Sequence, residues 1–112
     1  MTNKVIISGF FASRFKKFKK KFPSINNEIT VLIDSLKKNP ETGTSLGNGL
    51  FKIRLASRSK GKGKSGGFRI ITYLIKQTNK GTEIYLLTIY DKAEEGIITK
   101  DVLLEIVKRL IS

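Results

Sequence analysis

The chain has 112 residues, 39% of them hydrophobic and 28% charged, which predicts one globular domain over residues 1–112 with a single modest core. It has no cysteine and no histidine, which excludes disulfides and zinc-thiolate sites and removes the commonest metal ligand and general base, so we expect no metal and no cofactor. No apolar run approaches the roughly 20 residues that span a bilayer, and the apolar part of residues 1–11 is too short for a signal peptide, so we expect a cytoplasmic protein.

The positive charge is confined to one part of the chain. The net charge is +13, and residues 1–69 account for all of it, because residues 70–112 carry six basic and six acidic side chains. A basic surface restricted to part of a small domain is typical of proteins that bind a polyanion, and nucleic acid is the first candidate. An anionic membrane surface or an acidic protein partner would fit the same charge.

The first quarter of the chain predicts a strand and a helix. Residues 4–7 are an apolar run that ends at Ser8 and Gly9. The next segment, which Pro23 closes, has phenylalanines at spacings of four, three and four, so it predicts a helix with one face in the core. Six cations around this face are either a solvated surface or, because they repel one another, a sign of an anionic partner. The phenylalanines are Phe11, Phe15, Phe18 and Phe22.

A second helix and a polar loop follow. Ser24 is a suitable N-cap for a helix that buries an aliphatic stripe and ends at Asn39 and Pro40, so the two helices form a hairpin. The segment 40–49, PETGTSLGNG, is polar and rich in glycine, and its length suggests a functional or mobile loop. The stripe consists of Ile25, Ile29, Leu32, Ile33 and Leu36.

Residues 50–56 alternate between apolar and basic side chains, as in a strand with one buried face. The apolar side chains, from Phe51 to Leu55, would lie in the core, and Lys52 and Arg54 would lie on the other face. Basic residues also protect exposed strands from pairing with other chains, so these two cations alone are weak evidence of a function.

A basic loop rich in glycine separates this strand from the next. The segment 60–67, KGKGKSGG, suits a phosphate, but a loop of this composition taken alone is better explained as a mobile, solvated connection. Gly63, Lys64 and Ser65 match the last three residues of the P-loop motif. Arg58, however, stands where that motif requires its first glycine, and a strand is expected after the loop in place of a helix, which excludes this nucleotide-binding motif.

The second half predicts a hairpin of two central strands and a final helix. Residues 68–75 and 84–90 are apolar on both faces, with a short turn from Gln77 to Gly81 between them. Thr99 is the N-cap of the last helix. The predicted class is α+β with the order β-α-α-β-β-β-α, in which an antiparallel β-sheet carries an N-terminal helical hairpin and a C-terminal helix on one face.

In the order and spacing of these segments the sequence resembles the RelE/HigB superfamily of toxins from type II toxin–antitoxin systems, and in particular its HigB-like branch. The resemblance covers nearly the whole chain: the helical hairpin, GNGLFKIRLA, GKGKSGGFRIITYLI, IYLLTIYDKAEEGIIT and the terminal helix. It implies a RelE-like fold and a metal-independent endoribonuclease that cleaves mRNA in the ribosomal A site and that a cognate antitoxin neutralises.

The resemblance also assigns a cationic site. Lys52 and Arg54 match the basic positions of the family's second strand, and Arg69 matches the arginine that opens the third. Lys92 matches a basic residue that follows the fourth strand.

Two positions depart from the family. Ala93 stands where the best-known members have an arginine, and no tyrosine near the C-terminus matches theirs. Tyr90 is the nearest candidate, and it equally fits a tyrosine at the edge of the core. These departures keep open the alternative of a catalytically weak or inactive member that binds RNA, the ribosome or an antitoxin.

Cleavage of RNA by its own 2′-hydroxyl needs a proton acceptor, positive charge on the phosphorane and a proton donor to the 5′-oxygen. We expect Lys52 to act as the base and Arg54 and Arg69 to hold the phosphate. The ribosome would orient the message, while the glycine loop and the first helix hold ribosomal RNA through its backbone. The expected RNA-binding residues are Lys16, Lys17, Lys20, Arg58, Lys60, Lys62 and Lys64.

The partners that the resemblance implies are the ribosome, mRNA and a helix-turn-helix antitoxin. Operator DNA would be contacted only through the antitoxin complex, and no membrane partner is expected. A third reading of the basic charge is a general nucleic-acid or ribosome-associated module, whose affinity would fall with salt and would not depend on Lys52 or Arg69.

Overall fold

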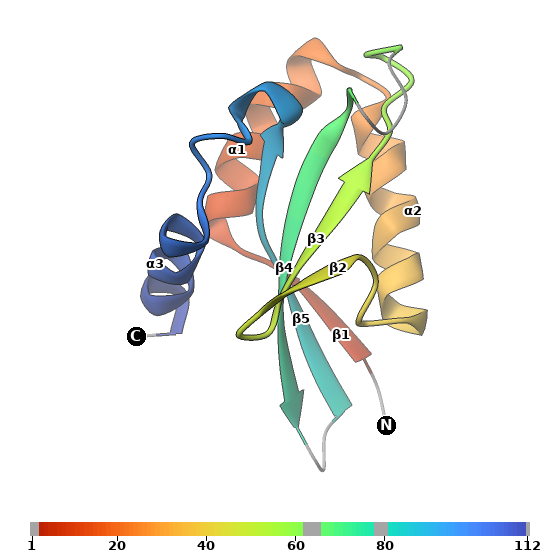
Figure 1. Ribbon diagram of the computed structural model, residues 1–112. Coiled ribbons are helices and arrows are strands. Elements are labelled where there is room, and N and C mark those ends of the chain that lie inside the picture. The colour runs from red at the N-terminus through yellow and green to blue at the C-terminus, as the bar shows by residue number, and fades with distance from the viewer. Residues whose placement is uncertain (1–2, 62–65, 78–80, 112) are drawn as a thin grey trace.

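The computed structural model describes residues 3–61, 66–77 and 81–111. It is an α+β structure with three α-helices and a five-stranded mixed sheet, so the predicted class is confirmed, with one strand more than expected (Figure 1). No helix among the described residues is long and apolar enough to cross a membrane. In chain order the elements are β1 (Asn3–Ile7), α1 (Gly9–Lys21), α2 (Ile25–Lys38), β2 (Thr44–Gly47), β3 (Leu50–Leu55), β4 (Phe68–Gln77), β5 (Gly81–Asp91), the 3₁₀ turn η1 (Lys92–Glu94) and α3 (Lys100–Ile111).

The strands lie in the order β1-β5-β4-β3-β2. From β2 to β5 each strand is antiparallel to the next, but β1 pairs with β5 in parallel, from Asn3 opposite Thr82 to Ile7 opposite Leu86. The prediction of a wholly antiparallel sheet is therefore wrong. The helical hairpin carries the chain from β1 to the far edge, and the four later strands return it to the side of β1 in the same direction.

The sheet is covered on both faces, so the prediction that all helices lie on one face is also wrong. On one face, here called the hairpin face, α1 and α2 pack on a core that includes Ile53, Phe68 and Ile70. On the other, the α3 face, Leu103 and Val107 of α3 pack on residues of β3, β4 and β5. Because β4 and β5 are apolar on both faces, each face needs a cover. The predicted phenylalanine and aliphatic stripes of α1 and α2 do lie in or against the hairpin-face core.

The helix starts are fixed by side-chain hydrogen bonds, with one exception. Thr99 caps α3 as predicted, because its hydroxyl accepts the Val102 N–H at 3.3 Å. Ser24 precedes α2 as predicted but does not cap it with its side chain. Its hydroxyl instead accepts the Ser59 N–H at 3.0 Å, which ties the segment after β3 to the start of α2.

The extra strand, β2, lies inside the segment 40–49 that was expected to be a loop. It forms a hairpin with β3 through Asn48 and Gly49, whose φ angles are 56° and 79°. Two successive residues with positive φ make the type I′ turn, which matches the twist of a two-residue hairpin and favours the sequence Asn-Gly. The hairpin holds β3 between β2 and β4, and β3 carries two of the predicted site residues.

Candidate functional site

Basic side chains from two adjacent strands meet on the α3 face, at the end of the sheet where β3 stops. Arg54 is opposite Arg69 in the β3–β4 register, and Lys52 is two residues before Arg54 on the same face. Arg69 faces away from Phe68 and Ile70, which lie in the hairpin-face core. Directly opposite side chains have Cβ atoms about 5 Å apart, so two arginines at these positions repel each other. The repulsion between these two arginines therefore lowers the stability of the folded chain.

Tyr90 extends this row onto β5, because it is opposite Arg69 in the β4–β5 register. Simple alternation from Leu86, which lies in the hairpin-face core, would put Tyr90 on that face as well. A bulge at Leu87 shifts the register, so that Tyr90 lies in the α3-face core, with only 2% of its surface exposed. Its burial agrees with the interpretation of Tyr90 as a tyrosine at the edge of the core.

Glu95, which the sequence analysis did not select, binds two of the cations at once. Its Oε1 accepts a hydrogen bond from Lys52 Nζ at 3.0 Å, and its Oε2 accepts one from Arg69 Nε at 3.2 Å. The Arg69 side chain is 2% exposed, whereas those of Lys52 and Glu95 are 24% and 31% exposed. The carboxylate therefore lies over the buried arginine, and solvent reaches the Lys52–Glu95 pair. We call Lys52, Arg54, Arg69 and Glu95 the cationic cluster.

The turn after β5 holds Glu95 in this position. Asp91 caps η1, because its Oδ1 accepts the Ala93 N–H at 3.0 Å, and the Glu94 side chain accepts the Asp91 N–H at 3.0 Å. Glu94 also binds Arg14 of α1, with Arg14 Nη2 2.7 Å from Glu94 Oε2. Asp91 binds Lys60 at 2.6 Å. Three acidic residues of one short segment thus bind cations from α1, from the loop after β3, and from β3 and β4.

The charges in this region change the pKa of its acidic groups. The hydrogen bond from Lys52 lowers the pKa of the Glu95 carboxyl, partial burial opposes it, and the charges of Lys52 and Arg69 lower it further. Burial raises the pKa of Asp91, but hydrogen bonds from Lys60 and the Ala93 N–H outweigh it, so that the net pKa is lowered. Burial raises the pKa of the Tyr90 hydroxyl, and the negative charge of Glu95 raises it further. At neutral pH, Glu95 and Asp91 are therefore carboxylates and Tyr90 keeps its proton.

These lowered pKa values predict a loss of stability in acid. A carboxyl whose pKa is lower in the folded chain stabilises the fold above its unfolded pKa, near 4, and this stabilisation is lost as the pH falls through the folded pKa. We expect the Tm of the Asp91→Asn, Glu95→Gln double variant to fall less than that of the unchanged chain between about pH 6 and about pH 3. Thermal unfolding followed by circular dichroism measures this difference. Parallel pH profiles for the two proteins would contradict it.

The other predicted site residues lie around the cluster or apart from it. Lys92 is exposed at the start of η1, and the ion pairs of the cluster do not include it. Lys60 stabilises the fold, because its ammonium binds Asp91 and lies 4.7 Å from the centre of the Phe68 ring. Lys62 and Lys64 lie outside the described residues. Lys16, Lys17, Lys20 and Arg58 are exposed.

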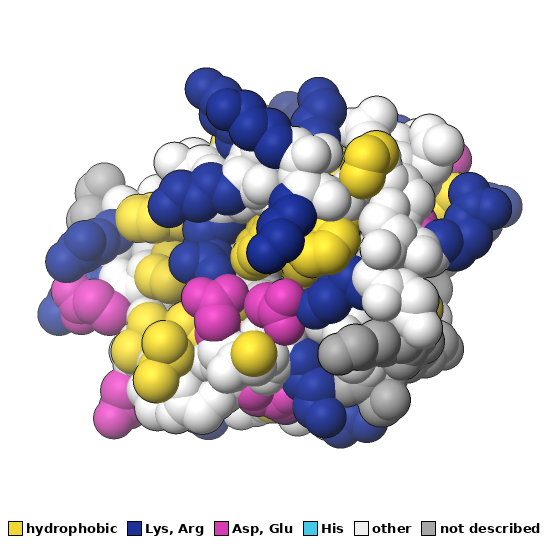
Figure 2. All heavy atoms as spheres, turned by 90° about the horizontal axis from the view of Figure 1, so that it is seen from above, with side chains coloured by type: hydrophobic (Ala, Val, Ile, Leu, Met, Phe, Trp, Pro, Cys, Tyr) yellow, Lys and Arg dark blue, Asp and Glu magenta, His cyan; other side chains and the backbone are white. Residues whose placement is uncertain are grey.

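The end of the molecule that carries the cluster is strongly basic. Figure 2 looks down on this end and shows many basic side chains across the top and sides of the view, with acidic side chains near the middle and toward the lower left. Five lysines of α1 and Arg58 contribute to the positive charge of residues 1–69, and α1 itself contains no acidic residue. A polyanion that approaches this end is therefore attracted by several basic side chains.

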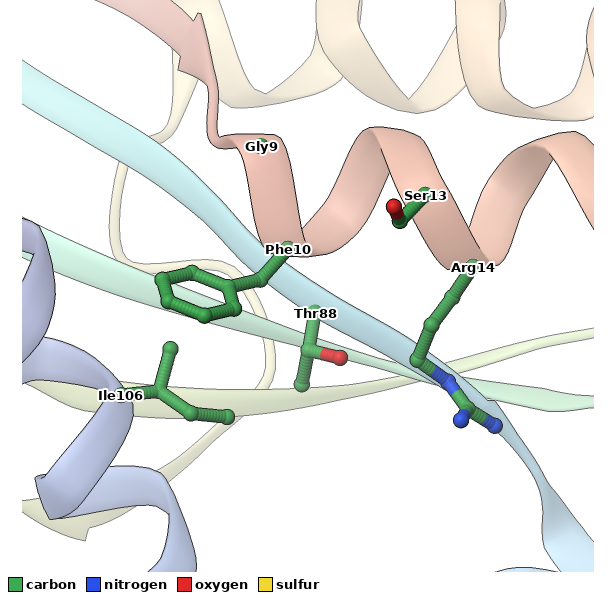
Figure 3. Close-up of a pocket in the computed structure, with 6 residues that line it drawn as sticks. All are labelled: Gly9, Phe10, Ser13, Arg14, Thr88 and Ile106. Atoms are coloured by element: carbon green, nitrogen blue, oxygen red, sulfur yellow. The ribbon is translucent and has the colours of Figure 1, made fainter.

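A pocket lies between α1, β5 and α3, and none of the residues that line it belongs to the cationic cluster. Its volume is about 480 Å³, and Figure 3 shows Phe10, Thr88 and Ile106 around it, with Arg14 at one end. Its surface is mainly apolar. Arg14 donates to the Ile89 carbonyl at 2.6 Å as well as to Glu94, so it holds α1 against β5 and η1. The polar residues of its lining are Ser13, Thr88 and Arg14, and Arg14 is bound to Ile89 and Glu94, so we take the cationic cluster as the candidate site.

Two further observations concern metal binding and similarity to known families. Among the described residues no group of three or more acidic side chains is placed to hold a metal ion. No protein-family model matches the chain.

Proposed function

We propose that this protein is a ribosome-dependent mRNA endoribonuclease of the RelE/HigB type, which cleaves RNA by attack of the 2′-hydroxyl on the adjacent phosphate. The observation that carries the proposal is the cationic cluster. It places Lys52, Arg54 and Arg69 on one face with the Glu95 carboxylate, so these four side chains together carry a net charge of +2, which attracts a phosphate. The resemblance of the sequence to this family supports the same reading.

The cluster suits the demands of the reaction. The pentavalent phosphorane carries more negative charge than the phosphodiester, so donors fixed around it stabilise the transition state more than the ground state. Arg54 is exposed, and its guanidinium can bind a phosphate that approaches from solvent. Arg69 is buried, so its position is fixed. The cluster has no histidine, so any proton transfer must use Lys52, Tyr90 or Glu95.

We propose that cleavage depends on the ribosome because the free protein has few groups that could orient the mRNA. Glu95 covers the buried Arg69. The site needs no deep cleft to hold the mRNA if the ribosome presents the message to it. The ribosomal A site would supply this orientation, and the lysines of α1 would bind ribosomal RNA. A helix-turn-helix antitoxin would neutralise the enzyme, and operator DNA would be bound only through that complex.

The test is cleavage of mRNA on programmed ribosomes. The unchanged protein should cut the message at codon-defined positions and leave the same mRNA intact when no ribosome is present. Lys52→Met should cut at least about 10²-fold more slowly, the scale for loss of one group that stabilises developing charge. Lys38→Met is the matched control, because it removes the same charge from an exposed position at the C-terminal end of α2. Intact message on ribosomes with folded protein would contradict the proposal.

A second candidate function is a non-catalytic member that binds RNA, the ribosome or an antitoxin. The observation that favours it is the pairing of both Lys52 and Arg69 with Glu95, together with the burial of Tyr90. In that case the protein should bind ribosomes while the message stays intact. Affinity should then be equal for the Lys52→Met and Lys38→Met variants, because only total charge matters to non-specific binding.

A further inference from the structure

The carboxylate at the centre of the cationic cluster is in the place that a phosphate of the substrate would take. Each of its oxygens accepts one hydrogen bond, from Lys52 and from Arg69. A phosphate oxygen accepts hydrogen bonds from the same two donors, and it carries comparable charge. A phosphodiester that binds the cluster therefore competes with Glu95 for its partners.

This competition changes the chemistry of Glu95. The hydrogen bond from Lys52 is the main cause of the low pKa of Glu95 in the free protein. When the phosphate takes over the donors, the carboxylate loses that stabilisation, and a negatively charged neighbour raises its pKa further. The displaced carboxylate stays next to the phosphate, because η1 is bound to Arg14 and Lys60 through Glu94 and Asp91. The binding of substrate thus turns a paired carboxylate into a better proton acceptor.

We infer that Glu95 and Lys52 are an acid–base couple, in which Glu95 takes the proton of the attacking 2′-hydroxyl and Lys52 gives a proton to the leaving 5′-oxygen. This inference rests on the proposed function and assigns its proton transfers. It moves Lys52 from the predicted role of base to that of proton donor, because Lys52 Nζ donates a hydrogen bond to Glu95 in the free protein.

The reaction balances with these two groups alone. The O2′–H bond breaks and its proton goes to the Glu95 carboxylate, while the O2′–P bond forms. The P–O5′ bond then breaks, and the 5′-oxygen takes a proton from the Lys52 ammonium. The products are a 2′,3′-cyclic phosphate and a 5′-hydroxyl end. Protonated Glu95 and neutral Lys52 remain, and because their atoms are 3.0 Å apart in the free protein, one proton transfer restores the starting state.

Other groups of the site are less suited to accept the proton. Arg54 and Arg69 have guanidinium groups, which donate hydrogen bonds and have no acceptor for a proton. Tyr90 is 2% exposed, and both burial and the charge of Glu95 hold its proton in place by raising its pKa. Glu94 and Asp91 are occupied with Arg14 and Lys60 and with the backbone of η1. Glu95 is the carboxylate that binds the cations of the cluster directly.

The first test measures single-turnover cleavage on ribosomes between about pH 6 and about pH 9. The unchanged protein should show a rate that depends less on pH than the rate of a variant without the base, because Glu95 then accepts the proton in place of hydroxide. Glu95→Gln should be at least about 10²-fold slower near pH 7, the usual scale for loss of a general base. Its rate should then rise about tenfold per pH unit, because hydroxide takes the place of the missing base. Glu105→Gln, on the exposed side of α3, is the control and should match the unchanged protein.

The second test examines Lys52 without changing Glu95. A synthetic message with sulfur in place of the bridging 5′-oxygen has a leaving group that needs no proton. Lys52→Met should cut this message at nearly the rate of the unchanged protein, although it is slow on the normal message. Melting temperatures show whether each variant folds.

The outcomes of these tests distinguish a failure of the Glu95–Lys52 acid–base couple from a failure of the proposed function. If the unchanged protein does not cut, the proposed function fails. If it cuts but Glu95→Gln keeps the full rate, or loses rate by the same factor at every pH, Glu95 is not the proton acceptor. If sulfur does not restore cleavage by Lys52→Met, Lys52 is not the donor, and this result holds even if Glu95→Gln does not fold.

Discussion

Arg69→Ala should abolish most of the cleavage on ribosomes and also weaken the fold. We expect the rate to fall by about 10²-fold or more, because a rigid donor is removed from beside the phosphorane. We also expect the free energy of unfolding to fall by about 3 kcal/mol, the lower end for breaking a buried charge pair, because Arg69 is 2% exposed and Glu95 is partly exposed. The sequence analysis expected Arg69 to open a strand next to a loop with room for a phosphate, whereas the structure buries it beneath Glu95.

The Arg69 prediction needs measurements that separate rate from fold. Unfolding in urea, ribosome binding and single-turnover cleavage should be measured for Arg69→Ala and Arg69→Lys. Arg69→Lys keeps the charge and should retain more stability than rate, because a lysine does not reproduce the fixed geometry of the guanidinium. Arg109→Ala, at an exposed position of α3, controls for the lost charge. Cleavage at the unchanged rate, or a loss explained wholly by the unfolded fraction, would remove Arg69 from the catalytic residues.

Phe68→Ala should destabilise the protein by about 3–5 kcal/mol, the range for loss of a buried phenylalanine. Phe68 is fully buried, and its ring packs against Phe18 and Phe22 at centroid distances of 4.9 and 5.4 Å. The Lys60 ammonium lies 4.7 Å from the same ring. The substitution therefore leaves a cavity between α1 and β4 and removes one support of Lys60, which binds Asp91.

The measurement for Phe68 is the free energy of unfolding from urea titration, with an unchanged m-value as the sign of an unchanged unfolding transition. Val31→Ala is a control, because Val31 is 66% exposed and its loss should change stability by less than about 0.5 kcal/mol. Since small domains have a total stability of about 5–15 kcal/mol, Phe68→Ala should leave little margin. A loss below about 1 kcal/mol would show that the neighbouring rings collapse into the space.

The sequence predicts well those features that produce a periodic pattern of apolar residues along one helix or strand. The spacing of the phenylalanines gave α1 and its buried face, and the alternation at Lys52 and Arg54 gave the strand that presents them. β4 and β5 were predicted as central strands because both faces are apolar, and they do lie within the sheet. Such patterns depend on the burial of each residue along one element, so a single sequence contains them.

Features that depend on how elements meet were missed. The parallel pairing of β1 with β5 joins residues 79 positions apart at Ile7 and Leu86, and no local pattern encodes it. The bulge at Leu87 moves Tyr90 to the α3 face, against the alternation expected along the strand. By contrast, Asn48-Gly49 is a strong local signal for a two-residue hairpin, and it was missed because the surrounding segment is polar.

The candidate site was predicted in part. The basic residues were found, but Glu95 was not, because a carboxylate near the end of a strand has no distinctive spacing. The pair Asp91 and Glu94 offered an indirect signal, since an acid followed three residues later by glutamate is typical of a capped turn. A turn at that point would place the next residue, Glu95, beside the start of β4, where Arg69 lies.

The pairing of β1 with β5 also has a consequence for the order in which the chain can fold during synthesis. β1 is made first, but its partner is complete only after Asp91 has been added. The cationic cluster likewise needs both Lys52 and Glu95. A nascent chain that ends before this point can form the helical hairpin and the β2–β3 hairpin, which are local, but not the sheet that joins them. The chain therefore acquires its fold and its cluster together and late, so truncated products of translation should have neither.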